Sequence, residues 1–287
     1  MSLEGSGLPL RCIYANAPGC MCSTGCYLLV LRVVLWESMP SYPPFPNAPL
    51  VEALLDIQVS PHAGAAFHLL ESFCDAVAAD YPERRHRKEW RTDVRVSDDG
   101  DATGGALEGG VVGYVVTSKD GKQIAQARLN GFSFSRLRPY RDWDQFIDEA
   151  ERLWRVYVET MAPAAIHRIA LRYINRLEIP LPFVDFREYV LTAPDVAPGL
   201  PQGLSHFLMQ LHFPSPEHEA VVIVTETVEP PIDDNKRLPF ILDIDAVRTG
   251  DLEISDDTLW QKFERLHELK NQVFFLSTTE KAKELFK

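Results

Sequence analysis

Short stretches in which apolar and polar residues alternate are the feature that most constrains what this chain can fold into. Between Val51 and Val59, apolar side chains at every second position alternate with Glu52, Asp56 and Gln58. A period of two predicts a strand with one buried face. Similar patterns predict further strands over 90–96, 111–117, 123–134, 167–179, 204–213, 219–228 and 238–247. The chain must therefore build a sheet of many strands.

Helical periodicity interrupts these strands at a few places. Apolar residues at three- and four-residue steps predict one helix from Phe67 towards Pro82 and another from its cap Asp142 to Met161. Three further helices are predicted: a short one started by Asp185 with Glu188 three residues on, one over about 256–270 broken by Asn271, and a final one capped by Ser277 and Glu280.

Adjacent strands with helices set to one side predict an α+β fold, in which an antiparallel sheet is backed by helices. Two halves, about 50–163 and 166–287, each follow the order β-α-β-β-β-α, so we expect a duplicated layout within one unit over 39–287. The glycines between Gly100 and Gly110 are interpreted as a hairpin loop, and Asp120-Gly121 as a hairpin turn.

The first 38 residues lack such periodicity. Four of the five cysteines lie here, at positions 12, 20, 22 and 26, without the paired C-x2-C knuckles of structural zinc sites. The stretch also lacks the charge pattern and cleavage site of a secretory signal. We expect residues 1–38 to lie outside the fold, with translation starting at Met39.

Composition argues against several classes of function. A formal net charge of −12 opposes binding to nucleic acid, and the basic residues from Arg84 to Arg91 are interpreted as the solvated end of a helix. The longest apolar run, from Tyr27 to Trp36, is too short to cross a membrane. Only Cys74 lies in the body of the chain, which is typical of a reducing compartment and predicts a cytoplasmic protein.

Four segments carry a family resemblance: Asn47-Ala-Pro-Leu-Val-Glu-Ala, Tyr140-x-x-Trp143-x-x-Phe146, Arg172-Tyr-Ile-Asn-Arg-Leu-Glu-Ile-Pro180 and Leu242-Asp-Ile-Asp245. From about residue 45 onwards, the chain resembles a sporadically distributed bacterial family of uncharacterised proteins. The resemblance implies no reaction, substrate or cofactor. A patchy distribution suits accessory components of bacterial multi-gene systems, including defence or stress systems.

Two aspartates are the best candidates for chemistry. Asp243 and Asp245 alternate with apolar residues and so project from one strand face, where they could hold Mg²⁺ or Mn²⁺. The alternative is an ion-pair network with Arg172 and Arg176 on the strand over 167–179. We expect the ion pairs.

The same strand carries the candidate ligand-binding residues. Asn175 shares a face with Tyr173, so a buried amide there must be hydrogen-bonded or face a cavity. If the sheet is concave, we expect Arg172, Tyr173, Asn175 and Arg176 in a pocket. His206 and His212 are expected on one exposed face of an edge strand, and with His218 their spacing is not specific for metal.

Motifs for nucleotide binding, zinc proteases and serine hydrolases are absent from the sequence. We therefore expect a binding or interaction module, not an enzyme, with no cofactor and with a protein partner or a second copy of the chain. Two alternatives remain open: a metal-dependent hydrolase that uses Asp243 and Asp245, and a small-ligand sensor whose pocket lies around Tyr173 and Asn175.

Overall fold

The computed structural model describes residues 42, 44–96, 102–234, 236–252, 254 and 256–287, and the side chains of these residues except 90–96, 102–109, 256 and 257. The segment expected outside the fold, residues 1–38, lies outside the described residues. Tyr42–Lys287 forms one compact unit.

The elements follow the two periodicities of the sequence. The strands are β1 Leu50–Ser60, β2 Glu83–Val96, β3 Ala102–Thr117, β4 Gln123–Arg128, β5 Gly131–Leu137, β6 Ala165–Pro180, β7 Leu208–Ser215, β8 Ala220–Val228 and β9 Arg237–Leu252. The α-helices are α1 Phe67–Val77, α2 Trp143–Met161, α3 Asp256–Ser277 and α4 Glu280–Glu284, with 3-10 turns η1 Phe186–Glu188 and η2 Pro216–His218.

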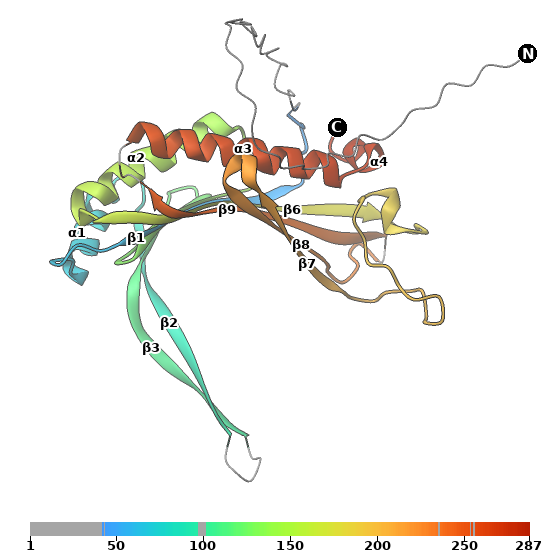
Figure 1. The fold of residues 1–287 in the computed structure, drawn as a ribbon, viewed down its shortest axis with the longest axis horizontal. Helices are drawn as coiled ribbons and strands as arrows, with labels where there is room; N and C mark the ends of the chain where they lie inside the picture. The colour runs from blue at the N-terminus through green and yellow to red at the C-terminus, as the bar shows by residue number, and fades with distance from the viewer. Residues whose placement is uncertain (1–41, 43, 97–101, 235, 253, 255) are drawn as a thin grey trace, which may run out of the picture. The chain divides into compact units, whose positions relative to one another are not determined.

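The strands form a single antiparallel sheet in the order β2-β3-β4-β5-β1-β6-β9-β8-β7. β1 and β6 pair at its centre, with Ala53 opposite Tyr173 and Leu55 opposite Leu171. Towards one edge from β1 lie β5, β4, β3 and β2, and towards the other from β6 lie β9, β8 and β7 (Figure 1). The α+β fold with an antiparallel sheet is therefore confirmed.

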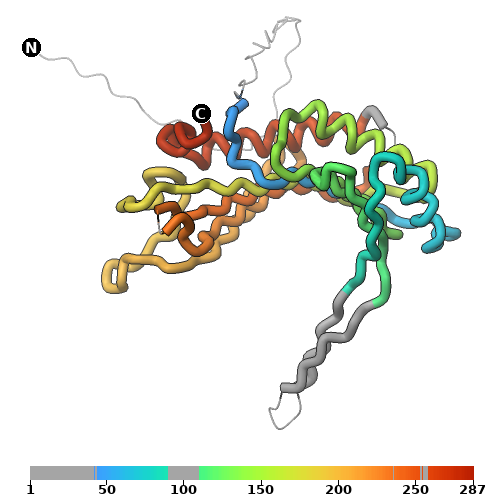
Figure 2. Tube along the Cα trace, turned by 180° about the vertical axis from the view of Figure 1, so that it is seen from behind, coloured from blue at the N-terminus to red at the C-terminus, as the bar shows by residue number. Residues whose placement is uncertain are grey.

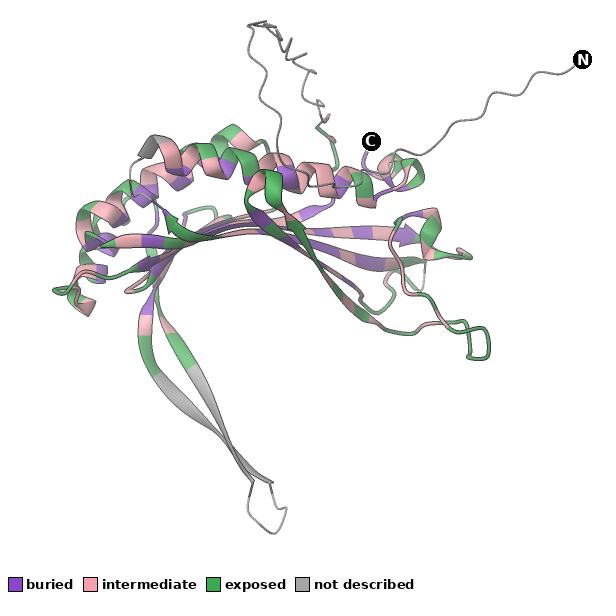
Figure 3. Cartoon of the chain, viewed as in Figure 1, coloured by how far each residue is buried: buried purple, intermediate pink, exposed green. Residues whose placement is uncertain are grey.

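The helices α1, α2 and α3 lie along one face of the sheet, as two opposite views show (Figures 1 and 2). Alternate strand residues point towards them and are fully buried, including Leu55 and Ile57 of β1 and Ile244 of β9. The apolar stripe of α2 meets this layer through Trp154 and Tyr157, whose rings pack against Phe132 of β5. Buried residues therefore gather between the helices and the sheet (Figure 3).

The opposite face of the sheet, which we name the open face, carries no helix among the described residues (Figure 1). Its residues alternate with the buried ones along each strand and are largely polar. They include Asp56 of β1, Arg168 and Arg172 of β6, and Asp243 and Asp245 of β9.

The repeated β-α-β-β-β-α layout is not confirmed. In the first half, the chain reverses at Leu129 and Asn130, so the expected strand over 123–134 is two strands, β4 and β5. Gly131 follows this turn at a position where a Cβ would lie 2.6 Å from the carbonyl oxygen of Ile57. In the second half, the segment expected to be a helix after Asp185 is only the 3-10 turn η1.

Two expectations about 83–110 are wrong. α1 ends at Val77, and the basic residues Arg84, Arg85 and Arg87 lie on β2, not at the end of a helix. The glycines at 104, 105, 109 and 110 lie within β3, which pairs with β2 from Ala102 onwards, so the expected loop is mostly strand. Charged residues fit the exposed surface of a helix as well as that of a strand, so the sequence pattern does not distinguish the two. Pairing between β2 and β3 makes this segment a strand.

Some of the predicted helix ends are confirmed and others are wrong. Asp142 caps α2 by accepting a hydrogen bond from the Gln145 amide at 2.8 Å, as expected, and Asp185 and Glu188 form a capping box on η1. The predicted break at Asn271 is wrong, because α3 continues to Ser277. Thr279 caps α4 in place of Ser277. His206 precedes β7, so it does not share a strand face with His212.

No described helix has both the length and the apolar character needed to span a membrane.

Within the helix-facing layer of the sheet, one acidic side chain is buried without a partner in the described part of the chain. Glu226 of β8 lies between Leu242 of β9 and Met209 of β7, is 1% exposed, and neither of its carboxylate oxygens has a hydrogen-bond partner among the described residues. Burial raises its pKa to about 7.

We expect Glu226→Gln to stabilise the fold at pH 8 and to change it little at pH 5. Because the folded pKa of Glu226 is raised, the folded state binds the extra proton between about pH 4.5 and 7. Stability due to the neutral acid is therefore present below this range and lost as pH rises through 7. Urea unfolding at pH 8 should show a gain of about 1–3 kcal/mol for the amide. Equal effects at both pH values would contradict this.

Candidate functional site

The four predicted ligand-binding residues do not come together. β6 alternates, so Tyr173 and Asn175 point towards the helices, while Arg172 and Arg176 point to the other side. Tyr173 and Asn175 line a cavity beneath α3, which we name the aromatic cavity. Arg176 lines a second cavity, which we name the arginine cavity, and Arg172 lines neither.

Arg172 pairs with Asp243 on the open face. Its Nε lies 2.9 Å from Oδ1 and 3.1 Å from Oδ2 of Asp243. This ion pair engages both carboxylate oxygens and raises the pKa of the guanidinium. The geometry is the ion pair that the sequence predicted for Asp243, formed with Arg172 and not with Arg176.

Asp245 lies beside this pair and is less well satisfied. Its Oδ2 is 3.9 Å from Arg168, and its buried Oδ1 has no hydrogen-bond partner among the described residues. Burial raises the pKa of Asp245 in spite of the nearby arginines. Arg168 instead pairs with Asp56, which accepts hydrogen bonds from Arg168 at 2.9 Å and from Arg128 at 2.6 Å.

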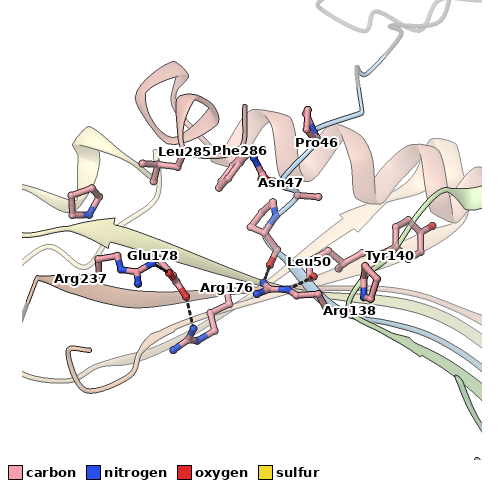
Figure 4. Close-up of a pocket in the computed structure, with 14 residues that line it drawn as sticks. Pro46, Asn47, Leu50, Arg138, Tyr140, Arg176, Glu178, Arg237, Leu285 and Phe286 are labelled. Atoms are coloured by element: carbon pink, nitrogen blue, oxygen red, sulfur yellow. Dashed lines mark hydrogen bonds and ion pairs between the residues drawn. The ribbon is translucent and has the colours of Figure 1, made fainter. Parts of the chain in front are cut away.

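The arginine cavity has a volume of about 550 Å³ and lies beside the chain segment that leads into β1 (Figure 4). Glu178 accepts hydrogen bonds from Arg176 at 2.8 Å and from Arg237. Within the part of the chain that the structure describes, Arg138 donates only to the backbone oxygens of Pro49 and Leu50, each at 3.4 Å. Two of the three arginines are thus held by acids, and Arg138 is exposed.

The aromatic cavity has a volume of about 250 Å³ and is assembled from four parts of the chain. The sheet supplies its floor, α3 its roof, and the start of α2 and the segment before β1 its walls. Its lining residues are Tyr42, Pro44, Phe45, Ala48, Pro49, Leu50, Tyr140, Arg141, Asp142, Trp143, Tyr173, Asn175, Ile244, His267, Lys270, Asn271, Phe274 and Phe275. Aromatic walls with a few polar groups are typical of small-molecule pockets, although this one lies just below their usual size of about 300–1,000 Å³.

Two polar side chains form the floor. Tyr173 is 2% exposed, and its hydroxyl lies 2.9 Å from the hydroxyl of Tyr140, with a raised pKa because of burial. Asn175 is 5% exposed and donates through Nδ2 to the backbone oxygens of Leu242 at 3.1 Å and Tyr173 at 3.3 Å. No hydrogen bond among the described residues uses Asn175 Oδ1. This amide therefore has an acceptor to offer in the cavity wall.

His267 forms part of the roof and stays neutral. Its ring stacks on Trp143 with centroids 4.1 Å apart and an angle of 4°. Burial, and secondarily the charge of Lys270, lowers its pKa to about 3. His267 Nε2 therefore accepts a hydrogen bond from Asn271 Nδ2 at 3.3 Å. The other ring of the stack, Trp143, donates through Nε1 to Glu264 at 2.6 Å.

Lys270 is the least expected group in the cavity. Its Nζ lies 3.7 Å from the centroid of the Tyr173 ring, a cation–π contact. Among the described residues it forms no ion pair with a carboxylate. Burial lowers its pKa from 10.5 to about 7. The amine is therefore poised between its charged and neutral forms near neutral pH.

The segment before β1 closes one side of the cavity. Tyr42 and Phe45 stack on Phe275 of α3 with ring centroids 4.6 and 5.6 Å apart. The Asn47 amide donates to the Phe286 oxygen at 3.0 Å, and its side chain donates to the Lys287 oxygen at 2.9 Å. The residues that follow, from Ala48 to Leu50, line both cavities and so form the partition between them.

Sequence reasoning missed the groups on α3. His267, Lys270 and Asn271 are spaced by three and four residues, which places them on one face of a helix. The predicted helix ended at Asn271, so this face was not recognised as a continuous one that reaches Phe274 and Phe275. The helical period of these five residues was the available signal.

Comparison with protein-family models finds no match, and no curated protein matches the sequence. Groups of three or more His, Cys, Asp or Glu side chains suited to a metal ion are not found among the described residues.

We expect millimolar Mg²⁺ or Mn²⁺ to leave the melting temperature unchanged. Arg172 engages both oxygens of Asp243, so a metal ion would have to displace a charge-assisted pair. Thermal melts of the natural chain and of the double variant Asp243→Asn, Asp245→Asn should respond alike to added metal. A rise that occurs in the natural chain and disappears in the double variant would support the metal-site alternative instead.

We expect Lys270→Met to raise the free energy of unfolding by about 1–2 kcal/mol at pH 7, because it removes a poorly solvated charge but also loses the cation–π contact. The folded pKa of Lys270 is depressed, so the unfolded chain binds the extra proton between about pH 7 and 10.5. The natural chain therefore gains stability as pH rises through this range. The advantage of the variant should shrink between pH 7 and 10 in urea unfolding, and a constant advantage would argue against a buried amine.

Proposed function

We propose that this protein is a non-catalytic binding protein that holds a small organic ligand in the aromatic cavity. The observation that carries the proposal is the partly buried Lys270, which meets the ring of Tyr173 in a cavity where Asn175 has an unused acceptor. Polar groups left without partners in a fold cost stability, and a ligand that satisfies them recovers that cost. This arrangement favours a ligand-binding role for these residues, as in a sensor or carrier, over a purely structural role in the core.

The shape of the cavity supports a small, flat ligand. Trp143 and His267 are parallel to each other, and Tyr140 and Tyr173 meet edge to face with centroids 5.7 Å apart. Flat aromatic walls give contact area to a planar molecule at little entropic cost, because such side chains have few rotatable bonds. A ligand in contact with these walls would lie between the sheet and α3.

The metal-dependent hydrolase is the less favoured alternative. Asp243 and Asp245 lie on the open face, while the aromatic cavity lies on the helix side of the same sheet. The two aspartates are accompanied by Arg168 and Arg172, which compete with a cation for the carboxylates. The interaction-module alternative would place a protein partner on the open face. The arginines of that face are largely paired with aspartates of the same sheet.

Native mass spectrometry of the protein purified gently from its own cells tests the proposal. We expect a fraction of the protein to carry an added mass of small-molecule size, and we expect Asn271→Trp to lose it by filling the cavity. Glu268→Trp is the matched control, because Glu268 lies on the same helix but does not line the cavity. Unchanged circular dichroism would show that both variants fold.

The outcomes separate the alternatives. Added mass that survives Asn271→Trp and disappears with Asp243→Asn would move the ligand to the open face. Added protein mass without a small molecule would support the interaction module. A protein that carries no small molecule in any preparation would count against the proposed function.

A further inference from the structure

We infer that the aromatic cavity selects an anionic ligand, a small planar organic acid whose carboxylate pairs with Lys270. This inference rests on the proposed function and names the class of ligand. Its basis is geometric: a primary amine reaches a cavity lined by aromatic rings, and none of the ion pairs among the described residues supplies it with a carboxylate.

The charge balance around the amine leaves room for one anion. Its Nζ contacts the Tyr173 ring, which stabilises a cation but cannot neutralise it. Asp142 lines the cavity, yet its Oδ1 caps α2 at the Gln145 amide, and Arg141 beside it brings the opposite charge. Glu264, on α3 itself, accepts from Trp143 Nε1. A ligand carboxylate would supply the missing partner.

The other titratable groups of the cavity do not compete for this role. Burial raises the pKa of both Tyr140 and Tyr173, so their hydroxyls stay protonated. One hydroxyl donates to the other, which leaves one hydroxyl hydrogen of the pair for a ligand. His267 stays neutral because its pKa is about 3. Tyr42, Tyr140, Arg141, Asp142, Tyr173, His267 and Lys270 are the titratable residues that line the cavity.

The two ends of the ligand are specified by different groups. Lys270 of α3 can pair with the carboxylate, and Asn175 Oδ1 on the floor can accept a hydrogen bond from an amine or hydroxyl elsewhere on the molecule. Between them, Trp143 and Tyr173 supply aromatic lining that a flat apolar body could contact. A cavity of about 250 Å³ limits that body to one small ring system.

Binding of an acid should be coupled to proton uptake. The free amine has a pKa of about 7, and a bound carboxylate raises it by favouring the charged form. Above pH 7, binding must therefore take up a proton, so the affinity should fall about tenfold for each pH unit. A neutral molecule of the same shape should show no such dependence.

The experiment is isothermal titration of the full chain with benzoate and with benzyl alcohol as the neutral isostere, at pH 6, 7.5 and 9. We expect benzoate to bind more tightly than benzyl alcohol at pH 6 and to lose this advantage by pH 9. Lys270→Met should weaken benzoate at pH 6 at least tenfold and leave benzyl alcohol unchanged. Lys262→Met, a lysine on the same helix outside the cavity, should change neither.

Three results would overturn the inference: benzoate affinity independent of pH, equal benzoate affinity in the natural chain and Lys270→Met, or affinity that rises with pH, as a reaction of the neutral amine would give. If benzyl alcohol binds as well as benzoate at every pH, the cavity is a ligand site without selection for anions. If neither probe binds, the anionic class is rejected, and the native mass spectrum alone decides the proposed function.

Discussion

The antiparallel pairing of β1 with β6 is the constraint on which the rest of the structure depends. It fixes which residues of both strands face the helices, because side chains alternate between the two faces with a period of two. With Ala53 opposite Tyr173, the tyrosine and Asn175 lie beneath α3, and Arg172 lies on the open face. A shift of one residue would exchange the two sets. The aromatic cavity and the open-face ion pairs are thus two products of one register.

The two faces deal with buried charge in different ways. On the open face, Asp56 is shared by Arg128 and Arg168, and Asp243 is paired with Arg172. On the helix side, Glu226 and Lys270 have no such partners among the described residues, and burial moves the pKa of each towards 7. On the open face the acids are mostly paired with arginines, with Asp245 as the exception, since burial raises its pKa. On the helix side, burial shifts Glu226 and Lys270 towards their neutral forms.

Much of the fold could be predicted from periodicity, because a sheet with one buried face and amphipathic helices both leave a regular apolar pattern. β1, β8 and α2 follow this rule closely. The sequence does not reveal the reversal at Leu129 and Asn130, because apolar residues continue through it. The predicted third helix ends too early, because Asn271 lies inside α3, where it lines a cavity, and does not end the helix.

The site was harder to predict than the fold. Tyr173 and Asn175 could be selected from one strand, since an amide on an apolar face requires a partner. Lys270 and His267 could not be assigned to them, because residues separated by almost a hundred positions meet only through the packing of α3 on β6 and β9. Local pattern carries no information on such pairs, and with one sequence there is no covariation to supply it.

The closure of the aromatic cavity by both ends of the described chain has a consequence for biosynthesis. The wall at Tyr42 and Phe45 rests on Phe275, and Asn47 is tied to Phe286 and Lys287. A ribosome-bound chain that still lacks α3 therefore lacks the roof of the cavity and the ring on which Tyr42 and Phe45 stack. A ligand of the kind proposed could therefore stabilise only chains in which α3 has already docked on the sheet.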